Sequence, residues 1–336
     1  MRITKHLAFF YQDDRIKYVN RIIEETNKYI YTTDLYIHTS IESDVLREKL
    51  IDLTNGDLHI IFHDLTNDEM FEQNRYYFMW KTRPLLAEQR NDYDIFIYID
   101  GDMLVPKEAI EYWLEYKDRV MDVNYNLGFL RIEIDEEGNE YTTDNSTFLT
   151  PEGIWEQYLN KTVLLDNELF VLNDANTYCA FWIYSKNEFN RFVDSEYYDM
   201  NNIEGYGIPE KVGIGLHGLL TPWYNGTIIP LDNDKLHPSC RIYHLPNNYV
   251  HKPDSFTLHL FDEVVKLNYI NNLITQVQPN EDCKSDNELI NPEPEDNITK
   301  IVKEIEEIRN DIKEMGNDVK NLKRLFEEFV GLYRFE

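Results

Sequence analysis

The stretch Asp94–Pro106, DIFIYIDGDMLVP, decides how the rest of the chain is interpreted. Its first part, Ile95–Ile99, is an unbroken run of β-branched and aromatic residues, typical of a strand buried on both faces of a largely parallel sheet. The run ends in Asp100-Gly101-Asp102, where glycine permits a tight turn and the two carboxylates can project to one side. Two carboxylates at the end of a buried strand repel each other unless a cation lies between them. The stretch therefore predicts a site for a hard divalent metal ion.

A surface Asp-Gly turn is the alternative interpretation of these residues. The chain after the turn favours the metal site, because Pro106 can begin a helix over the following KEAIEYWLEY segment, where a surface hairpin would need a second strand.

Segments of strand and helix alternate before this stretch. Strands are predicted at 3–11, 35–38 and 58–62, and helices at 13–30, 45–53 and 71–90. After it, we predict a helix to about residue 120, strands at 128–134 and 178–184 and a helix at 186–194. Asp13 or Asp14 is expected to cap the first helix. The alternation predicts an α/β fold, with a mixed, mostly parallel sheet flanked by helices.

A hydrophobic strand followed by Asp-x-Asp and a short apolar segment resembles the metal and sugar-nucleotide site of GT-A-fold glycosyltransferases, and the resemblance covers about residues 1–260. It implies a GT-A-like, Rossmann-like domain in which Asp102 binds Mn²⁺ or Mg²⁺ directly and Asp100 contacts the metal or the donor ribose. It also implies that a late histidine completes the metal site. His244, at the end of the strand-like RIYH run, matches that placement best, and His251 is the alternative.

Ligands of open α/β sheets bind beyond the carboxyl ends of the strands, which makes Tyr11, Asp64 and Asp100 candidates for contact with the nucleotide-sugar donor. The resemblance implies that Tyr11 stacks on the base. It also implies that Arg83, in the helix before the Asp94 strand, reaches the diphosphate or the donor sugar, which suits the bidentate geometry of arginine. Core packing of Tyr11 and a solvated helix face for Arg83 are the alternatives.

The resemblance further implies a catalytic base in the acidic segment 203–218. Glu210 follows Pro209 in the first turn of a predicted helix, where the helix dipole keeps a carboxylate ionised. Glu204 is the second candidate, and an ordinary helix-terminal carboxylate is the alternative to both.

Composition limits the partners and the compartment. The net charge of −29 argues against nucleic acid and anionic membranes, and no stretch approaches the roughly 20 apolar residues of a membrane span. Cys179, Cys240 and Cys283 are far apart, which indicates free thiols in a reducing compartment. With no visible signal peptide, we expect a cytoplasmic location.

The spacing of apolar residues changes near the end of the sequence. A domain at 1–262 is followed by an acidic linker at 263–297. Over 298–333, apolar residues recur at alternating steps of three and four, which predicts a parallel coiled coil and a homo-oligomer, with a trimer ahead of a dimer or tetramer. A helix lying on its own domain is the alternative.

These features predict a metal-dependent glycosyltransferase, specifically a hexosyltransferase. It would move a sugar from a nucleotide-diphosphate sugar, with a UDP-sugar favoured, to an acceptor hydroxyl of a glycan or protein. The alternatives are a metal-dependent nucleotidyltransferase and a non-catalytic scaffold or binding protein that keeps the GT-A-like domain and the coiled coil.

Overall fold

A computed structural model describes residues 1–65, 75–143, 146–150, 153–156, 158–173, 180–199, 224–251, 258–267 and 275–276. The chain divides into two units, Met1–Asn280 and Glu281–Glu336, and all described residues belong to the first. The predicted coiled coil, Glu204 and Glu210 lie outside the described residues.

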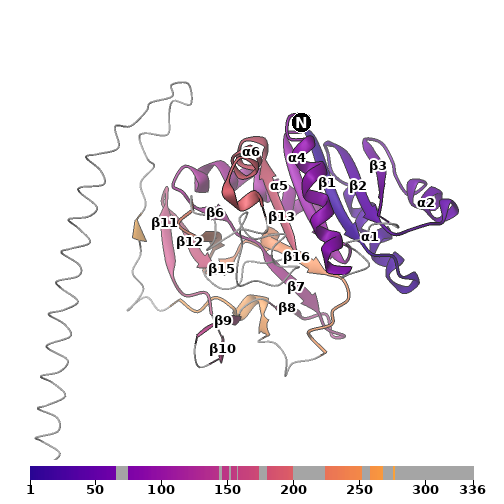
Figure 1. The fold of residues 1–336 in the computed structure, drawn as a ribbon. Helices are drawn as coiled ribbons and strands as arrows, with labels where there is room; N and C mark the ends of the chain where they lie inside the picture. Colours follow the sequence, from indigo (N-terminus) through magenta and orange to yellow (C-terminus); the bar gives the residue numbers. More distant parts are fainter. Residues whose placement is uncertain are drawn as a thin grey trace, which may run out of the picture. The chain divides into compact units, whose positions relative to one another are not determined.

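The central sheet has five strands in the order β13-β4-β1-β2-β3 (Figure 1). Its members are β1 (Arg2–Phe9), β2 (Thr32–Thr39), β3 (Leu58–Asp64), β4 (Ile95–Asp100) and β13 (Phe181–Ser185). The first four are parallel, and β13 pairs antiparallel with β4. This confirms the prediction of a mixed, mostly parallel α/β sheet.

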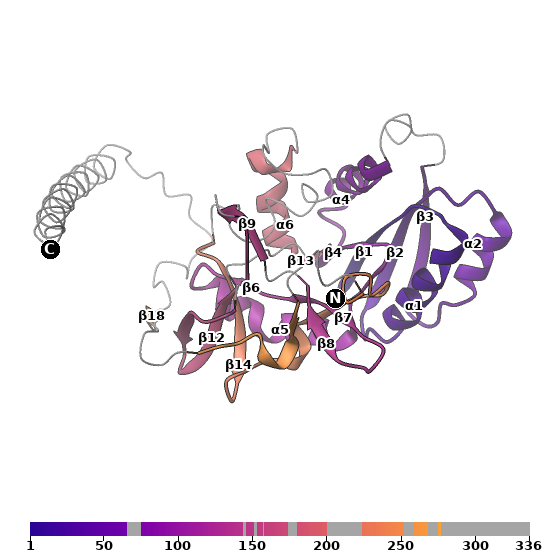
Figure 2. The same ribbon diagram turned by 90° about the horizontal axis from the view of Figure 1, so that it is seen from below.

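Helices cover both faces of this sheet. They are α1 (Ile16–Thr26), α2 (Asp44–Ile51), α4 (Thr82–Glu88), α5 (Lys107–Met121) and α6 (Lys186–Val193). On one face, Lys5 of β1 donates to Thr26 of α1 at 2.9 Å. On the other, Thr4 donates to Gln89, just after α4, at 3.1 Å. Figure 2 shows α1 and α5 on one side of the strands and α4 and α6 on the other.

The start of α1 differs from the prediction. Asp13–Arg15 form a short 3₁₀ segment, and Arg15 occupies the N-cap position of α1 without a capping side-chain hydrogen bond. The prediction that Asp13 or Asp14 caps α1 is therefore wrong. The 3₁₀ turn places both aspartates ahead of the position from which a side chain reaches the first free N–H groups of the helix.

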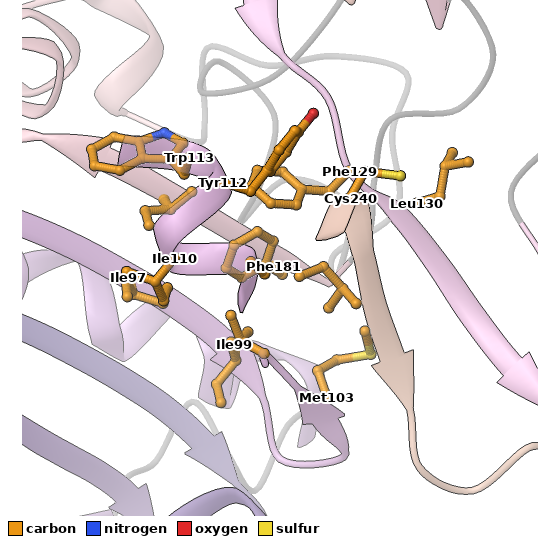
Figure 3. Packing of buried hydrophobic residues seen from close by; sticks show 14 of the residues in the cluster. Ile97, Ile99, Met103, Ile110, Tyr112, Trp113, Phe129, Leu130, Phe181 and Cys240 are labelled. Carbon is orange, nitrogen blue, oxygen red and sulfur yellow. The ribbon is translucent and has the colours of Figure 1, made fainter. Parts of the chain in front are cut away.

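Strand β4 is apolar throughout because both of its faces are covered. Figure 3 shows Ile97 and Ile99 of β4 packed with Ile110 of α5. On the opposite face, Phe96 stacks on Phe189 of α6 with ring centroids 4.4 Å apart. Burial on both sides explains why the sequence here shows a continuous run without alternation.

A second sheet has the order β17-β8-β7-β16-β5. Its strands are β5 (Met103–Leu104), β7 (Leu130–Ile134), β8 (Glu140–Thr142), β16 (Arg241–His244) and β17 (His259–Leu260). β7 lies within the strand predicted at 128–134 and pairs antiparallel with β8.

Further strands were not assigned from the sequence. A six-stranded sheet contains β6 (Asn126–Leu127), β11 (Thr162–Leu165), β12 (Glu168–Asn173), β14 (Thr227–Asp232), β15 (Lys235–Leu236) and β18 (Thr275–Gln276). Strands β9 (Ser146–Thr150) and β10 (Gly153–Glu156) pair with each other. Since β18 pairs with β11, the first unit extends past the predicted boundary at residue 262.

None of the helices in the described part of the chain has the length and apolarity needed to cross a membrane. Cys240 is a buried free thiol, and Cys179 and Cys283 lie outside the described residues.

Candidate functional site

The site begins where the ends of β1 and β4 touch. In the strand register Ala8 lies beside Asp100, and the chain turns at Gly101 directly after it. A Cβ atom on Gly101 would stand 2.9 Å from the Ala8 carbonyl oxygen and 2.9 Å from the Phe9 ring. Only glycine permits this close approach, so the turn residue fixes the two aspartates against the end of β1.

The second sheet places His244 beside Asp102. Strand β5 follows the turn and pairs antiparallel with β16, so that Met103 lies opposite His244. The Leu245 N–H donates to the Asp102 carbonyl at 2.9 Å, which closes the end of the ladder. Asp102 Oδ2 and His244 Nε2 are 3.7 Å apart as a result.

The other ring nitrogen of His244 is held by Glu133 of β7. His244 Nδ1 hydrogen-bonds to Glu133 Oε1, and Glu133 is fully buried. Glu133 Oε2 accepts the N–H groups of Tyr249 and Val250 at 2.7 and 2.9 Å. A carboxylate that accepts three hydrogen bonds assigns the Nδ1 proton to the imidazole, and Nε2 is then the nitrogen that faces Asp102.

Asp100 completes what we call the Asp102 cluster, defined as Asp100, Asp102, Glu133 and His244. Tyr98 donates its hydroxyl to Asp100 Oδ1 at 2.5 Å. Burial and the charge of Asp102 raise the pKa of Asp100 to about 7. Burial works against ionisation of Asp102 as well, but His244 and the nearby guanidinium groups hold its pKa below the usual value.

Two arginines balance part of this negative charge. Arg15, at the start of α1, forms an ion pair with Asp102 Oδ2. Arg131 is 9% exposed and donates to Thr143 at 3.0 Å, with its guanidinium over the ring of Tyr249.

The donor set fits a divalent metal ion held by two residues. Within the described ranges, no three His, Cys, Asp or Glu side chains are placed together as a metal-binding group. Asp102 and His244, however, lie close enough for one cation to reach both at about 2.1 Å. Histidines that bind metals usually donate their second ring N–H to a carboxylate, as His244 does to Glu133. Water or phosphate oxygens would supply the remaining positions.

Three predicted residues lie elsewhere. Asp64 pairs with Arg47 at 2.7 Å on β3, which is separated from β4 by β1 and β2. Three strand spacings put it roughly 14 Å from Asp100. His251 is exposed. Arg83 is 3% exposed and donates to the Tyr198 carbonyl at 2.9 Å, so α4 and the segment after α6 hold its guanidinium; burial lowers its pKa to about 9.

Tyr11 lies just beyond the end of β1. Its N–H donates to Ser40 Oγ at 3.1 Å, and its hydroxyl donates to Asp13. The ring is partly exposed and meets Phe9 edge-on, with centroids 6.4 Å apart. Both core packing and stacking on a ligand are compatible with this placement, and the predicted role stays a prediction.

Sequence reasoning missed Glu133 and Arg15. Glu133 alternates with apolar residues in Leu130–Ile134, a pattern that usually indicates a solvent-facing side chain. Pairing of β7 with both β8 and β16 buries it instead. Arg15 is 87 residues from its partner Asp102, and nothing local to it indicates that contact.

No family model matches the chain, and no curated protein matches it in sequence. Glycosyltransferases are among the solved structures similar to it. They include mouse xyloside xylosyltransferase 1, with a TM-score of 0.28, 11% identity and coverage of 40% of this chain and 53% of that chain. The bifunctional WbbM glycosyltransferase has a TM-score of 0.35 and 12% identity, covering 67% of this chain and 38% of that chain. The galactosyltransferase LgtC has a TM-score of 0.36 and 15% identity, covering 68% and 72%.

The chain thus spans about half the length of the xylosyltransferase and less than half of WbbM. Likeness at these TM-scores gives no residue correspondence.

Proposed function

We propose that the protein is a metal-dependent glycosyltransferase that uses a nucleotide-diphosphate sugar, with a UDP-sugar favoured, and transfers a hexosyl group to a hydroxyl of a glycan or protein. The observation that carries the proposal is the pairing of Asp102 with a His244 that Glu133 orients. This pair stands at the carboxyl end of a parallel sheet, where ligands of α/β proteins bind.

Each residue has a separate part. Asp102 and His244 would hold Mn²⁺ or Mg²⁺, and Glu133 fixes the imidazole so that Nε2 faces the site. A bound divalent ion would supply Lewis-acid stabilisation of the departing diphosphate. Asp100, which lies beside Ala8 at the end of β1, would contact the metal shell or the donor ribose.

The acceptor hydroxyl needs a base if the reaction inverts the anomeric carbon. We keep Glu210, with Glu204 second, as candidates for that base. A product of retained configuration would remove this role from both.

A screen of nucleotide-sugars for release of the nucleoside diphosphate, with Mn²⁺ and with the metal chelated, tests the proposal. We expect one donor to be hydrolysed or transferred only with metal. Release of pyrophosphate from a nucleoside triphosphate would favour a nucleotidyltransferase. Failure to bind any nucleoside diphosphate with Mn²⁺ by calorimetry would favour the scaffold.

We also propose that residues 298–333 assemble the chain as a parallel homo-oligomer, a trimer ahead of a dimer or tetramer, and that the protein is cytoplasmic. Light scattering on the full chain and on a form lacking 298–336 tests the assembly. We expect the truncated form to be a monomer that still binds nucleotide, and a monomeric full chain would contradict the coiled coil.

A further inference from the structure

Arg15 has no role in the site as predicted, yet it makes the closest cationic contact with Asp102. We propose that Arg15 binds the diphosphate of the donor, and that it occupies the metal-binding oxygen of Asp102 until metal and diphosphate arrive together. This inference rests on the proposed function and adds to it a residue that links metal binding to diphosphate binding.

The first argument is charge. Asp100, Asp102 and Glu133 bring three carboxyl groups into one partly buried region. Burying like charges is unfavourable unless cations compensate them. Without a metal, Arg15 and Arg131 are the arginines placed to do so within the described residues.

The two arginines differ in freedom. Arg131 is buried, donates to Thr143 and lies over Tyr249, so these contacts hold its guanidinium in one position. The Arg15 side chain is 35% exposed, whereas that of Asp102 is 16% exposed. Arg15 can therefore leave Asp102 for a neighbouring anion without opening the core.

The second argument is competition for one atom. Arg15 contacts Oδ2 of Asp102, and the same Oδ2 faces His244 Nε2. A cation shared by Asp102 and His244 must use this oxygen, so it meets the guanidinium at the position it needs. Two cations on one carboxylate oxygen repel each other, and the bound metal displaces Arg15.

The third argument is where the displaced side chain would go. Arg15 ends the short 3₁₀ segment that follows β1, and the hydroxyl of Tyr11 donates to Asp13 in the same segment. The metal is expected to share the diphosphate oxygens, which places that anion within reach of a guanidinium released from Asp102. Arginine can bind phosphate oxygens through two parallel N–H donors, whereas its contact with Asp102 uses one nitrogen, Nη2.

The proposal predicts effects of opposite sign from one substitution. Arg15→Gln should tighten binding of Mn²⁺ alone by roughly 10-fold, because the internal competitor is gone, and weaken binding of pyrophosphate at saturating Mn²⁺ by roughly 10-fold. Free Mn²⁺ is followed by electron paramagnetic resonance, and pyrophosphate by calorimetry. Arg21→Gln, an exposed position on α1 with the same change of charge, is the matched control and should leave both affinities within about twofold.

Unchanged or weaker Mn²⁺ binding in Arg15→Gln, with the wild type binding metal normally, would overturn the inference alone. Tighter binding of both Mn²⁺ and pyrophosphate would overturn it too, since Arg15 would then act only as an inhibitory contact. Equal effects in Arg21→Gln would assign the changes to net charge and also overturn it. A wild-type protein that binds neither Mn²⁺ nor Mn²⁺ with pyrophosphate would overturn the proposed function itself.

Discussion

Two polar clusters lie on or beside the central sheet, and their titratable side chains are compensated in different ways. One is the Asp102 cluster at the ends of β1 and β4. The other is a histidine chain, defined as His6 of β1, His38 of β2 and His63 of β3, which crosses three neighbouring strands. Both place titratable side chains in the protein interior, yet only one of them carries an excess of charge.

His6 and His38, the two buried members of the histidine chain, are kept neutral by burial. His6 Nε2 faces Gln89 Oε1 at 3.0 Å, and an amide oxygen only accepts, so this nitrogen carries the proton. His6 Nδ1 then accepts from His38 Nε2 at 2.8 Å, and His38 Nδ1 accepts from His63 Nδ1 at 2.8 Å. Burial lowers the pKa of His6 to about 3 and that of His38 well below its usual value.

The Asp102 cluster has no such balance. Its carboxyl groups are acceptors when ionised, and they depend on Arg15, Arg131 and the proton of His244 for compensation. A buried cluster whose donors and acceptors match is complete without a ligand, whereas one with surplus charge stabilises a bound cation. This difference is why we propose the Asp102 cluster as the binding site and interpret the histidine chain as structural.

Removing a carboxylate from the Asp102 cluster should have the largest effect. Asp102→Asn is expected to abolish Mn²⁺-dependent nucleotide binding in calorimetry, because the anionic ligand is lost. The melting temperature of the metal-free protein should fall, because the amide no longer compensates Arg15 and His244, which stabilise the ionised Asp102 carboxylate in the fold. Undiminished metal-dependent transfer in this variant would remove Asp102 from the metal site.

Acidification should separate the two clusters next. The pKa of His6 and His38 is lower in the folded than in the unfolded state, where it is near 6.5. Between the two values these histidines are protonated only in the unfolded state, so the free energy of unfolding decreases as the pH falls. At pH 5 the loss from His6 is about 2 kcal/mol, and His38 contributes in the same direction. Asp100 acts in the opposite direction, because its folded pKa of about 7 lies above the unfolded value of 3.8 and its protonation below pH 7 stabilises the fold.

Urea unfolding of metal-free protein at pH 7 and pH 5 measures this balance. Asp100→Asn removes the opposing contribution and should make the loss on acidification larger than in the wild type. An equal or smaller loss in Asp100→Asn would show that the two clusters do not titrate as their environments indicate.

Breaking the histidine chain should change stability without changing the metal site. His38→Leu removes the hydrogen bond from His38 to His6 Nδ1 and the one from His63 Nδ1 to His38. We expect the free energy of unfolding to fall by about 3 kcal/mol in urea titrations. The Mn²⁺ affinity should remain that of the wild type, and a parallel loss of affinity would mean that the histidine chain belongs to the binding site.

The sequence predicted the strands of the central sheet that contain an apolar run, including β3, most of whose residues are partly or fully exposed. β1 to β4 each show an apolar run, and their alternation with helices allowed the parallel sheet to be predicted correctly. The short strands β9 to β12 went unassigned because no helices separate them in the described part of the chain, so the strand–helix alternation that guided the prediction is absent there.

Only part of the candidate site could be predicted from the sequence. Asp100 and Asp102 could be found because they end a buried strand, whereas the choice of His244 depended on the family resemblance. Glu133 could not be found, since its burial depends on the register that pairs Tyr243 of β16 with Ile132 of β7. Such contacts depend on which distant strands become neighbours, and local pattern carries no information about that.

The smallest predicted effect concerns the carboxylate that supports His244. Glu133→Gln keeps the side-chain volume and can still accept the His244 Nδ1 proton, but its amide N–H₂ would then face the N–H groups of Tyr249 and Val250. The imidazole loses its charged support, and we expect the Mn²⁺ affinity to fall by roughly 10-fold, far less than in Asp102→Asn. Calorimetry gives the affinity, and His38→Leu, which perturbs a neutral cluster instead, is the control. An unchanged affinity in Glu133→Gln would show that Glu133, like the histidine chain, serves only the fold.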